Sequence, residues 1–208
     1  MAGFLARPLG RRQFTKLLMA TALGGIVSSV GVARAAVDPA EVYVTGVASE
    51  VMALANSGAS GNSLRTKFAA LLNRHINLRA IGNYALGTYQ NKIPAGKKEE
   101  FYRLVSNYSA ALFVYYVEDF RGSGLDIMST NMQGKFITIQ SAIKLKGGGR
   151  EQVRWRLLLA GNGFKVSDVN VKGVWLTISM KDRFSKILSK SKGDFNALFA
   201  ELRQAESW

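Results

Sequence analysis

Few residues in this chain could carry acid–base or metal chemistry, and they lie far apart. It has one histidine, His75, and no cysteine, which excludes disulfides, thiolate metal sites and a cysteine nucleophile. A metal site needs several ligands at close spacing, and the sequence offers His75 no second ligand at such a spacing. A serine hydrolase needs a histidine base and a G-x-S-x-G turn, and neither is evident. We therefore predict no metal, no cofactor and no hydrolase triad.

Asp168 is the one carboxylate for which the sequence suggests a catalytic role. It interrupts a valine-rich run that extends from Phe164 to Leu176. A half-buried aspartate in a curved sheet can act as a general base on a small apolar substrate. The alternative is structural, because an aspartate can fix a bulge by accepting hydrogen bonds from neighbouring amides. We favour the structural role and keep the catalytic one as an alternative.

The segment from Gln152 to Leu188 would position this carboxylate. From Gln152 to Leu159 apolar and polar residues alternate, which is typical of a strand with one buried face. Asn162-Gly163 predicts a tight turn, and Phe164 to Leu176 predicts the return strand. Its alternation breaks at Ser167-Asp168, where a bulge would keep both apolar sets on one side. Two earlier strands, Asp126 to Met132 and Phe136 to Leu145, are expected to pair through Gln133-Gly134.

Helical periodicity dominates the chain before these strands. Helices are predicted from Asp38-Pro39 to Asn56, from Asn62-Ser63 onward and from Leu78 to Leu86. The longest helix is predicted to follow the charged residues Lys97 to Glu100 and to end at about Asp119. A last helix should run from Asp194 to about Gln204. The predicted fold class is α+β, with helices over about 36–120, a four-stranded antiparallel sheet over about 125–178 and closing helices over about 179–205.

The first 35 residues have the features of an export signal. A basic start with Arg11-Arg12 precedes a mildly apolar run, and Ala33-Arg34-Ala35 matches an A-x-A cleavage site. The run G-R-R-Q-F-T-K at residues 10–16 resembles a twin-arginine signal. We expect cleavage after Ala35, with residues 36–208 forming a single exported domain.

The charge of the mature chain points to anionic surfaces rather than to nucleic acid. The whole chain carries a net charge of +14, and removal of the five basic residues of the leader leaves +9. Such a charge favours encounters with anionic lipid surfaces and acidic partners. Zinc-finger spacing and aromatic RNA-binding motifs are absent from the sequence, and we predict no nucleic-acid partner.

Two motifs carry a resemblance to a known family. The run F-K-V-S-D-V-N-V-K-G-V-W-L at 164–176, followed by R-F-S-K-I-L at 183–188, resembles the end of the MlaC / toluene-tolerance family. The segment N-L-R-A-I-G-N-Y-A-L-G at 77–87 resembles a short helix of that family. This chain departs from the family pattern at Asn77 and Leu78, at Tyr89 in place of tryptophan, and at Trp175 in place of a small residue. The resemblance extends from about Ala36 to the C-terminus.

The resemblance implies a periplasmic carrier that moves phospholipid between the two membranes of Gram-negative bacteria. The implied fold is a strongly curved antiparallel sheet of the NTF2-like kind, embraced by helices that enclose an apolar cavity for acyl chains. The implied partners are an inner-membrane ABC transporter of the MCE type and an outer-membrane lipid donor complex. Some relatives are linked to hopanoid lipids, so a polycyclic cargo is an alternative.

On this hypothesis the aromatic stripe of the long helix and the inward face of the sheet would line the cavity. The residues that we expect there are Phe101, Val105, Tyr108, Leu112, Tyr116, Ile137, Ile139, Val153, Trp155, Leu157, Val166 and Val171. The competing hypotheses are an enzyme on the same scaffold that uses Asp168, and a periplasmic adaptor with a fully packed core.

Overall fold

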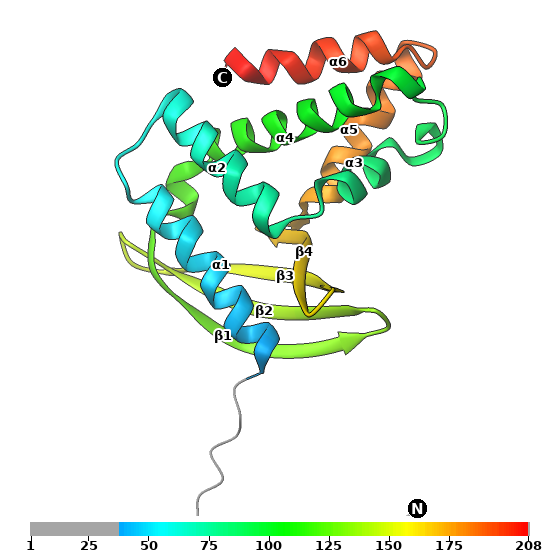
Figure 1. Ribbon diagram of the computed structural model, residues 1–208. Coiled ribbons are helices and arrows are strands. Elements are labelled where there is room, and N and C mark those ends of the chain that lie inside the picture. The colour runs from blue at the N-terminus through cyan, green and yellow to red at the C-terminus, as the bar shows by residue number, and fades with distance from the viewer. Residues whose placement is uncertain (1–37, 208) are drawn as a thin grey trace, which may run out of the picture. The chain divides into compact units, whose positions relative to one another are not determined.

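The protein is represented by a computed structural model that describes residues 38–207, all within the unit Ala36–Trp208. The expected export signal and its cleavage site lie outside the described residues. Helices come first along the chain, an antiparallel sheet follows, and two helices close the fold (Figure 1). This order confirms the predicted α+β class.

Local capping signals set the starts of three helices. Helix α1 (Pro39–Ala55) begins at Asp38, whose carboxylate accepts a hydrogen bond of 2.8 Å from the backbone N–H of Ala40. Asn77 caps α3 (Leu78–Leu86) in the same way, and Asp194 caps α6 (Phe195–Gln204). The predicted starts of these helices are confirmed.

The remaining helices differ slightly from the predicted bounds. Helix α2 spans Gly61–His75 and α5 spans Leu176–Lys190. Helix α4 spans Lys98–Tyr115 and gives way to the 3-10 turn η3, Val117–Phe120, so the α-helix ends before the predicted Asp119. Short 3-10 turns η1 (Gly87–Tyr89), η2 (Ala95–Lys97) and η4 (Ala205–Ser207) complete the helical part. An ion pair between Glu100 on α4 and Arg203 on α6 joins these two helices.

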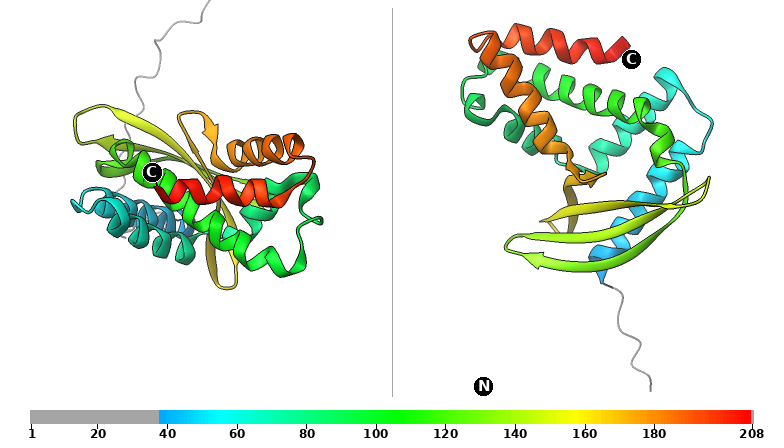
Figure 2. Two further views of the ribbon diagram at one scale, coloured as in Figure 1. Left: turned by 90° about the horizontal axis from the view of Figure 1, so that it is seen from above. Right: turned by 180° about the vertical axis from the view of Figure 1, so that it is seen from behind.

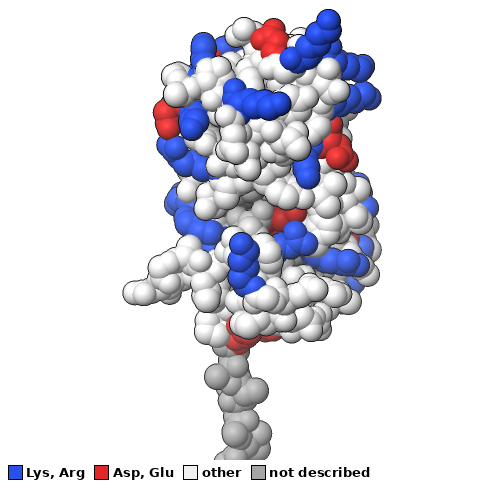
Figure 3. Space-filling view, turned by 90° about the vertical axis from the view of Figure 1, so that its right-hand side faces the viewer, with Lys and Arg blue, Asp and Glu red and all other residues white. Residues whose placement is uncertain are grey.

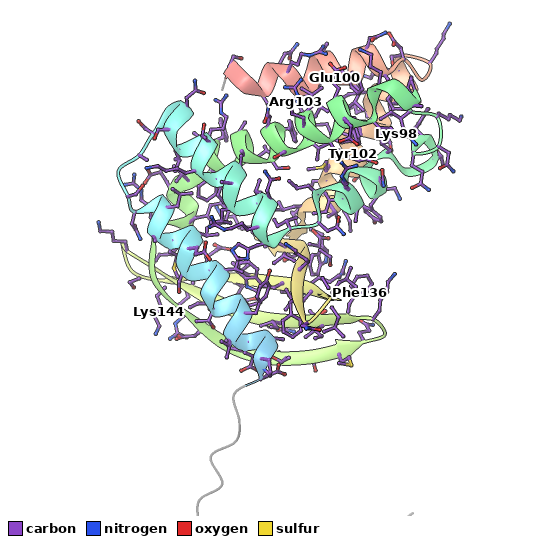
Figure 4. The ribbon with its side chains drawn as sticks, viewed as in Figure 1. Lys98, Glu100, Tyr102, Arg103, Phe136 and Lys144 are labelled. Carbon is purple, nitrogen blue, oxygen red and sulfur yellow. The ribbon has the colours of Figure 1, made fainter. Side chains whose placement is uncertain are left out.

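The sheet is a meander in which each strand pairs with the next. Its strands are β1 (Gly122–Gln133), β2 (Phe136–Leu145), β3 (Arg150–Ala160), β4 (Gly163–Val171) and β5 (Val174–Trp175). Phe136 and Lys144 mark the two ends of β2 (Figure 4). The prediction of four strands was wrong because the chain reverses after Val171. Lys172 and Gly173 adopt positive φ angles of 51° and 83°, and β5 folds back onto β4.

Two predicted turns are displaced by one residue. Because Gln133 pairs with Phe136, the first turn is Gly134-Lys135 rather than Gln133-Gly134. Because Ala160 pairs with Gly163, the second is Gly161-Asn162 rather than Asn162-Gly163. In each turn it is the glycine in the first position that takes a positive φ, of 60°. Glycine adopts this conformation without the steric penalty that a Cβ would bring.

Bulges bend the sheet and set which side chains share a face. The predicted bulge in β4 is confirmed, because Leu157 pairs with Val166 while Arg156 pairs with Asp168, leaving Ser167 as the extra residue. Strand β1 has two further irregularities, between Gly122 and Gly124 and between Ile127 and Ser129, and it curves visibly beneath α1 (Figure 1).

The buried residues form three separate clusters rather than one core. The helical cluster joins α3, the N-terminal part of α4, α5 and α6, with Phe101, Phe184 and Phe199 near its centre. The sheet cluster joins α1 to β2 and β3. The α2 cluster joins α2 to the C-terminal part of α4, where Phe68 and Phe113 stack at 3.6 Å between ring centroids. Figure 2 shows α5 rising from β5 towards α4 and α6.

Gly122 provides a test of the packing where β1 begins. A Cβ at this position would lie 2.7 Å from Ile143 Cγ2 and 2.8 Å from the carbonyl oxygen of Lys144. Gly122→Ala should therefore lower the free energy of unfolding by about 1–3 kcal/mol, measured by urea denaturation.

Gly124→Ala is the matched control in the same strand. A Cβ there meets nothing closer than 4.0 Å, so this variant should be as stable as the wild type within about 0.5 kcal/mol. Equal destabilisation of the two variants would contradict the steric explanation.

Candidate functional site

A partly open cavity of about 910 Å³ lies where the three clusters meet. This volume is at the upper end of the range of about 300–1,000 Å³ for small-molecule pockets. Helices α1, α2, α3, α4 and α5 contribute to its wall together with strands β2 to β5. The wall is mainly aliphatic and aromatic. On one face of the molecule the surface is hollowed between the helices and the sheet, with Lys and Arg side chains on both borders (Figure 3).

Seven of the twelve predicted cavity residues line this space. They come from the C-terminal half of α4, from the residue that follows this helix, and from the inward face of β3 and β4: Tyr108, Leu112, Tyr116, Val153, Trp155, Val166 and Val171. Tyr116 is half exposed and lies near the rim. Part of the α4 stripe and part of the sheet face therefore meet across the cavity.

The other five predicted residues are buried elsewhere. Phe101 and Val105 belong to the helical cluster, because the N-terminal half of α4 packs against α5 and α6 rather than over the sheet. Ile137, Ile139 and Leu157 belong to the sheet cluster, where α1 covers them. All five are fully buried, between 0% and 9% exposed, and fill protein cores instead of lining the cavity.

Several polar groups in the deeper part of the cavity wall are hydrogen-bonded within the protein. The Ser109 hydroxyl donates to the carbonyl oxygen of Val105 at 2.8 Å. The indole N–H of Trp155 donates to Ser141 Oγ at 2.9 Å, and that hydroxyl donates to the carbonyl oxygen of Val153. Burial raises the pKa of the Tyr108 phenol, so Tyr108 is neutral at physiological pH. This part of the wall consequently presents an apolar surface, because these polar atoms are already satisfied.

Asp168 links the sheet to the start of α5. Its Oδ1 accepts hydrogen bonds from the backbone N–H groups of Val169, at 2.9 Å, and Thr177, at 3.1 Å. Its Oδ2 accepts from the Thr177 hydroxyl at 2.6 Å and lies 3.6 Å from the Arg156 guanidinium. The side chain thus caps a helix N-terminus from a neighbouring strand, which matches the structural alternative for this residue.

Within residues 38–207 the structure contains no group of three or more metal-ligating side chains. In the same range, none of the helices has both the length and the apolar character needed to cross a bilayer.

A model of the MlaC protein family matches residues 45–204. The chain belongs to the MlaC family. Its fold is similar to that of a phospholipid-binding protein from Ralstonia solanacearum, solved in complex with a phospholipid. The two chains are 16% identical, with a TM-score of 0.66 over 81% of this chain and 95% of the other. No curated protein sequence matches this chain.

The structure locates one departure of this MlaC-family chain from the motif. Trp175, which stands where the motif has a small residue, is not among the residues that line the cavity. Its ring lies 4.1 Å from the Arg156 guanidinium carbon, in a cation–π contact. The larger side chain is therefore not part of the cavity wall and packs instead on Arg156, which lies 3.6 Å from Asp168.

Sequence reasoning missed the cavity residues that α1, α2, α3 and α5 contribute. Among them are Val47 and Val51 on α1, Phe68 and Leu72 on α2, and Ile81 on α3. The amphipathic periodicity of these helices marks the residues as inward-facing. Periodicity does not distinguish an inward face that packs against protein from one that borders a cavity, since both require apolar side chains.

The capping role of Asp168 predicts a stability effect. Asp168→Ala removes three hydrogen bonds and leaves the Thr177 amide without its partner, so the free energy of unfolding should fall by about 2–4 kcal/mol. Chemical denaturation followed by circular dichroism measures it. Asp182→Ala, at an exposed position on α5, should change stability by less than about 0.5 kcal/mol. Similar values for the two variants would rule out the cap.

Proposed function

We propose that this MlaC-family protein is a periplasmic carrier that holds the acyl chains of a phospholipid in the cavity. The observation that supports this best is the cavity itself, which is partly open, has a mainly apolar wall and a volume of about 910 Å³. The similar fold of a phospholipid-binding protein agrees with such a cargo.

The physics of lipid transfer explains why a carrier would be needed. Burial of a methylene group is worth about 0.8 kcal/mol, so exposing two chains of about sixteen carbons to water costs on the order of 20 kcal/mol. A barrier of that size makes unaided transfer through water slow. An apolar cavity removes most of this cost while the polar headgroup stays at the rim, in water. This role requires no catalytic residue.

The pathway in this proposal follows from family membership. The carrier exchanges lipid between the outer membrane and the inner membrane, where an ABC transporter assembly of the MCE type is its partner, and an outer-membrane complex is the other. The export signal expected before residue 36 supports a periplasmic location. The basic balance of the chain favours transient contact with anionic membrane surfaces.

The contacts of Asp168 bear on the enzymatic alternative. A general base needs a free lone pair directed at the substrate, whereas both oxygens of Asp168 accept hydrogen bonds from α5 or β4. The adaptor alternative requires a packed core, and a cavity of this size argues against it. We therefore assign the cavity to cargo binding.

Leu112→Arg tests the cavity as the chain-binding site. Leu112 lines the cavity from α4 and is only half-buried, so a charged side chain there can reach solvent and the fold should survive. Val153, which is 1% exposed, is less suitable for such a substitution. Protein purified from bacterial cells without detergent should carry about one lipid per chain in native mass spectrometry. The variant should carry at least about tenfold less, because its guanidinium would be buried against acyl chains.

Leu159→Arg is the control, since Leu159 lies at the β3 end and is 70% exposed. It should retain the lipid content of the wild type. Normal lipid loading in a folded Leu112→Arg protein would count against the cavity, and a wild-type protein that never carries lipid would count against the carrier function itself. Extraction of the bound lipid identifies it as a two-chain phospholipid or as a polycyclic, hopanoid-type lipid.

A further inference from the structure

Helix α5 has an apolar face and a basic face. Met180, Phe184 and Leu188 are buried in the helical cluster. Arg183, Lys186 and Lys190 follow one another at spacings of three and four residues, which places them on a common face of the helix, and all three border the cavity. The basic face of α5 therefore lies beside the apolar space in which we place acyl chains.

The charges on this face are not all compensated within the protein. Arg183 forms an ion pair with Glu201 on α6, and this hydrogen bond raises the pKa of Arg183. Lys186 and Lys190 are exposed and lie one turn apart. Like charges at this spacing repel each other and destabilise a helix. Two carboxylates near this face also line the cavity, Asp182 on α5 and Glu201 on α6. The three cations Arg183, Lys186 and Lys190 therefore outnumber the carboxylates on this side of the rim.

A lipid bound in the cavity must place its headgroup at the rim. Its phosphate would then lie within reach of the α5 lysines, where it would relieve their mutual repulsion and form charge-assisted hydrogen bonds. A zwitterionic headgroup adds a cation that the lysines repel. A headgroup with a net negative charge and no cation is not repelled in this way.

We propose that Lys186 and Lys190 form a headgroup site at the cavity rim, which makes this carrier prefer anionic two-chain phospholipids over zwitterionic ones. The inference rests on the proposed carrier function and specifies its cargo class. Positive charge at the C-terminal end of α5 also stabilises the helix through its dipole. That effect concerns stability and has no influence on which lipid is bound.

Competition between two lipids tests the proposal. Protein expressed from the full sequence and stripped of lipid is incubated with vesicles that contain equal amounts of phosphatidylglycerol and phosphatidylcholine with identical chains. It is then separated, and its bound lipid is quantified by mass spectrometry. Because both lipids share one vesicle, attraction to an anionic membrane surface affects them equally. The wild type should be enriched at least about threefold in phosphatidylglycerol, the size expected for screened surface charges.

The K186Q/K190Q variant should bind the same total amount of lipid as the wild type, with a ratio of phosphatidylglycerol to phosphatidylcholine near one. The matched control is K67Q/K98Q, which removes two exposed lysines that do not line the cavity. Lys98 lies at the N-terminal end of α4 (Figure 4). This control should keep the wild-type ratio. Asp182→Asn should raise the enrichment, because it removes the negative charge nearest to the lysines in sequence on this face.

Several outcomes would overturn the headgroup site while leaving the carrier function intact. The first is a ratio of bound phosphatidylglycerol to phosphatidylcholine of one in the wild type. The second is an unchanged ratio in K186Q/K190Q, and the third is an equal loss of enrichment in K67Q/K98Q. A second competition assay in excess inorganic phosphate, with chloride at the same ionic strength as its control, tests whether the lysines bind a lipid phosphate or a free phosphate ion. The enrichment should survive it, because the acyl chains hold the lipid phosphate at the rim, and its loss would assign the lysines to a free anion. Absence of bound lipid in every protein would instead reject the carrier function.

Discussion

The attachment of α5 to the sheet depends on the carboxylate of Asp168. It joins β4 to the first turn of α5 through Thr177, at the point where the chain passes from the sheet into the helical part. Helix α5 forms a wall of the cavity and also packs its other face against α3, α4 and α6. The orientation of this helix therefore sets one side of the cavity. A buried carboxylate whose two oxygens both accept hydrogen bonds holds α5 in place, because any displacement of the helix would leave a buried charge without partners.

The cavity exists because the apolar residues are divided among three clusters. A chain of this size and composition has enough apolar side chains to form one continuous core. Here the helical cluster, the sheet cluster and the α2 cluster each pack internally. Residues such as Val51 and Ile76 join the sheet cluster to the α2 cluster, and the rest of the surface between the clusters borders the cavity. Polar atoms in that surface, such as those of Ser109 and Trp155, bond to protein partners. Water gains little from entering such a space, whereas an apolar ligand gains much.

Local sequence signals predicted much of the fold and part of the site. Caps at Asp38, Asn77 and Asp194 act over a few residues, so they could be recognised from the sequence. The bulge at Ser167 could be inferred because it corrects a visible break in alternation. The reversal at Lys172-Gly173 was missed, since a lysine at positive φ has no clear sequence signal. The burial of Phe101 and Ile139 in packed cores was equally hidden, because tertiary partners decide whether an apolar face meets protein or a cavity.

The division into three clusters has a consequence for how easily the interior can change its size. In a protein with one continuous core, separating two layers breaks close packing throughout the interior and leaves voids. In this fold, the layers can separate along the cavity while each cluster keeps its own contacts. Elastic compliance is then concentrated in the apolar contacts between the clusters, whereas the hydrogen-bonded link between β4 and α5 stays fixed. Chains of different length or saturation could be accommodated by small rigid-body shifts of packed units, without local unfolding.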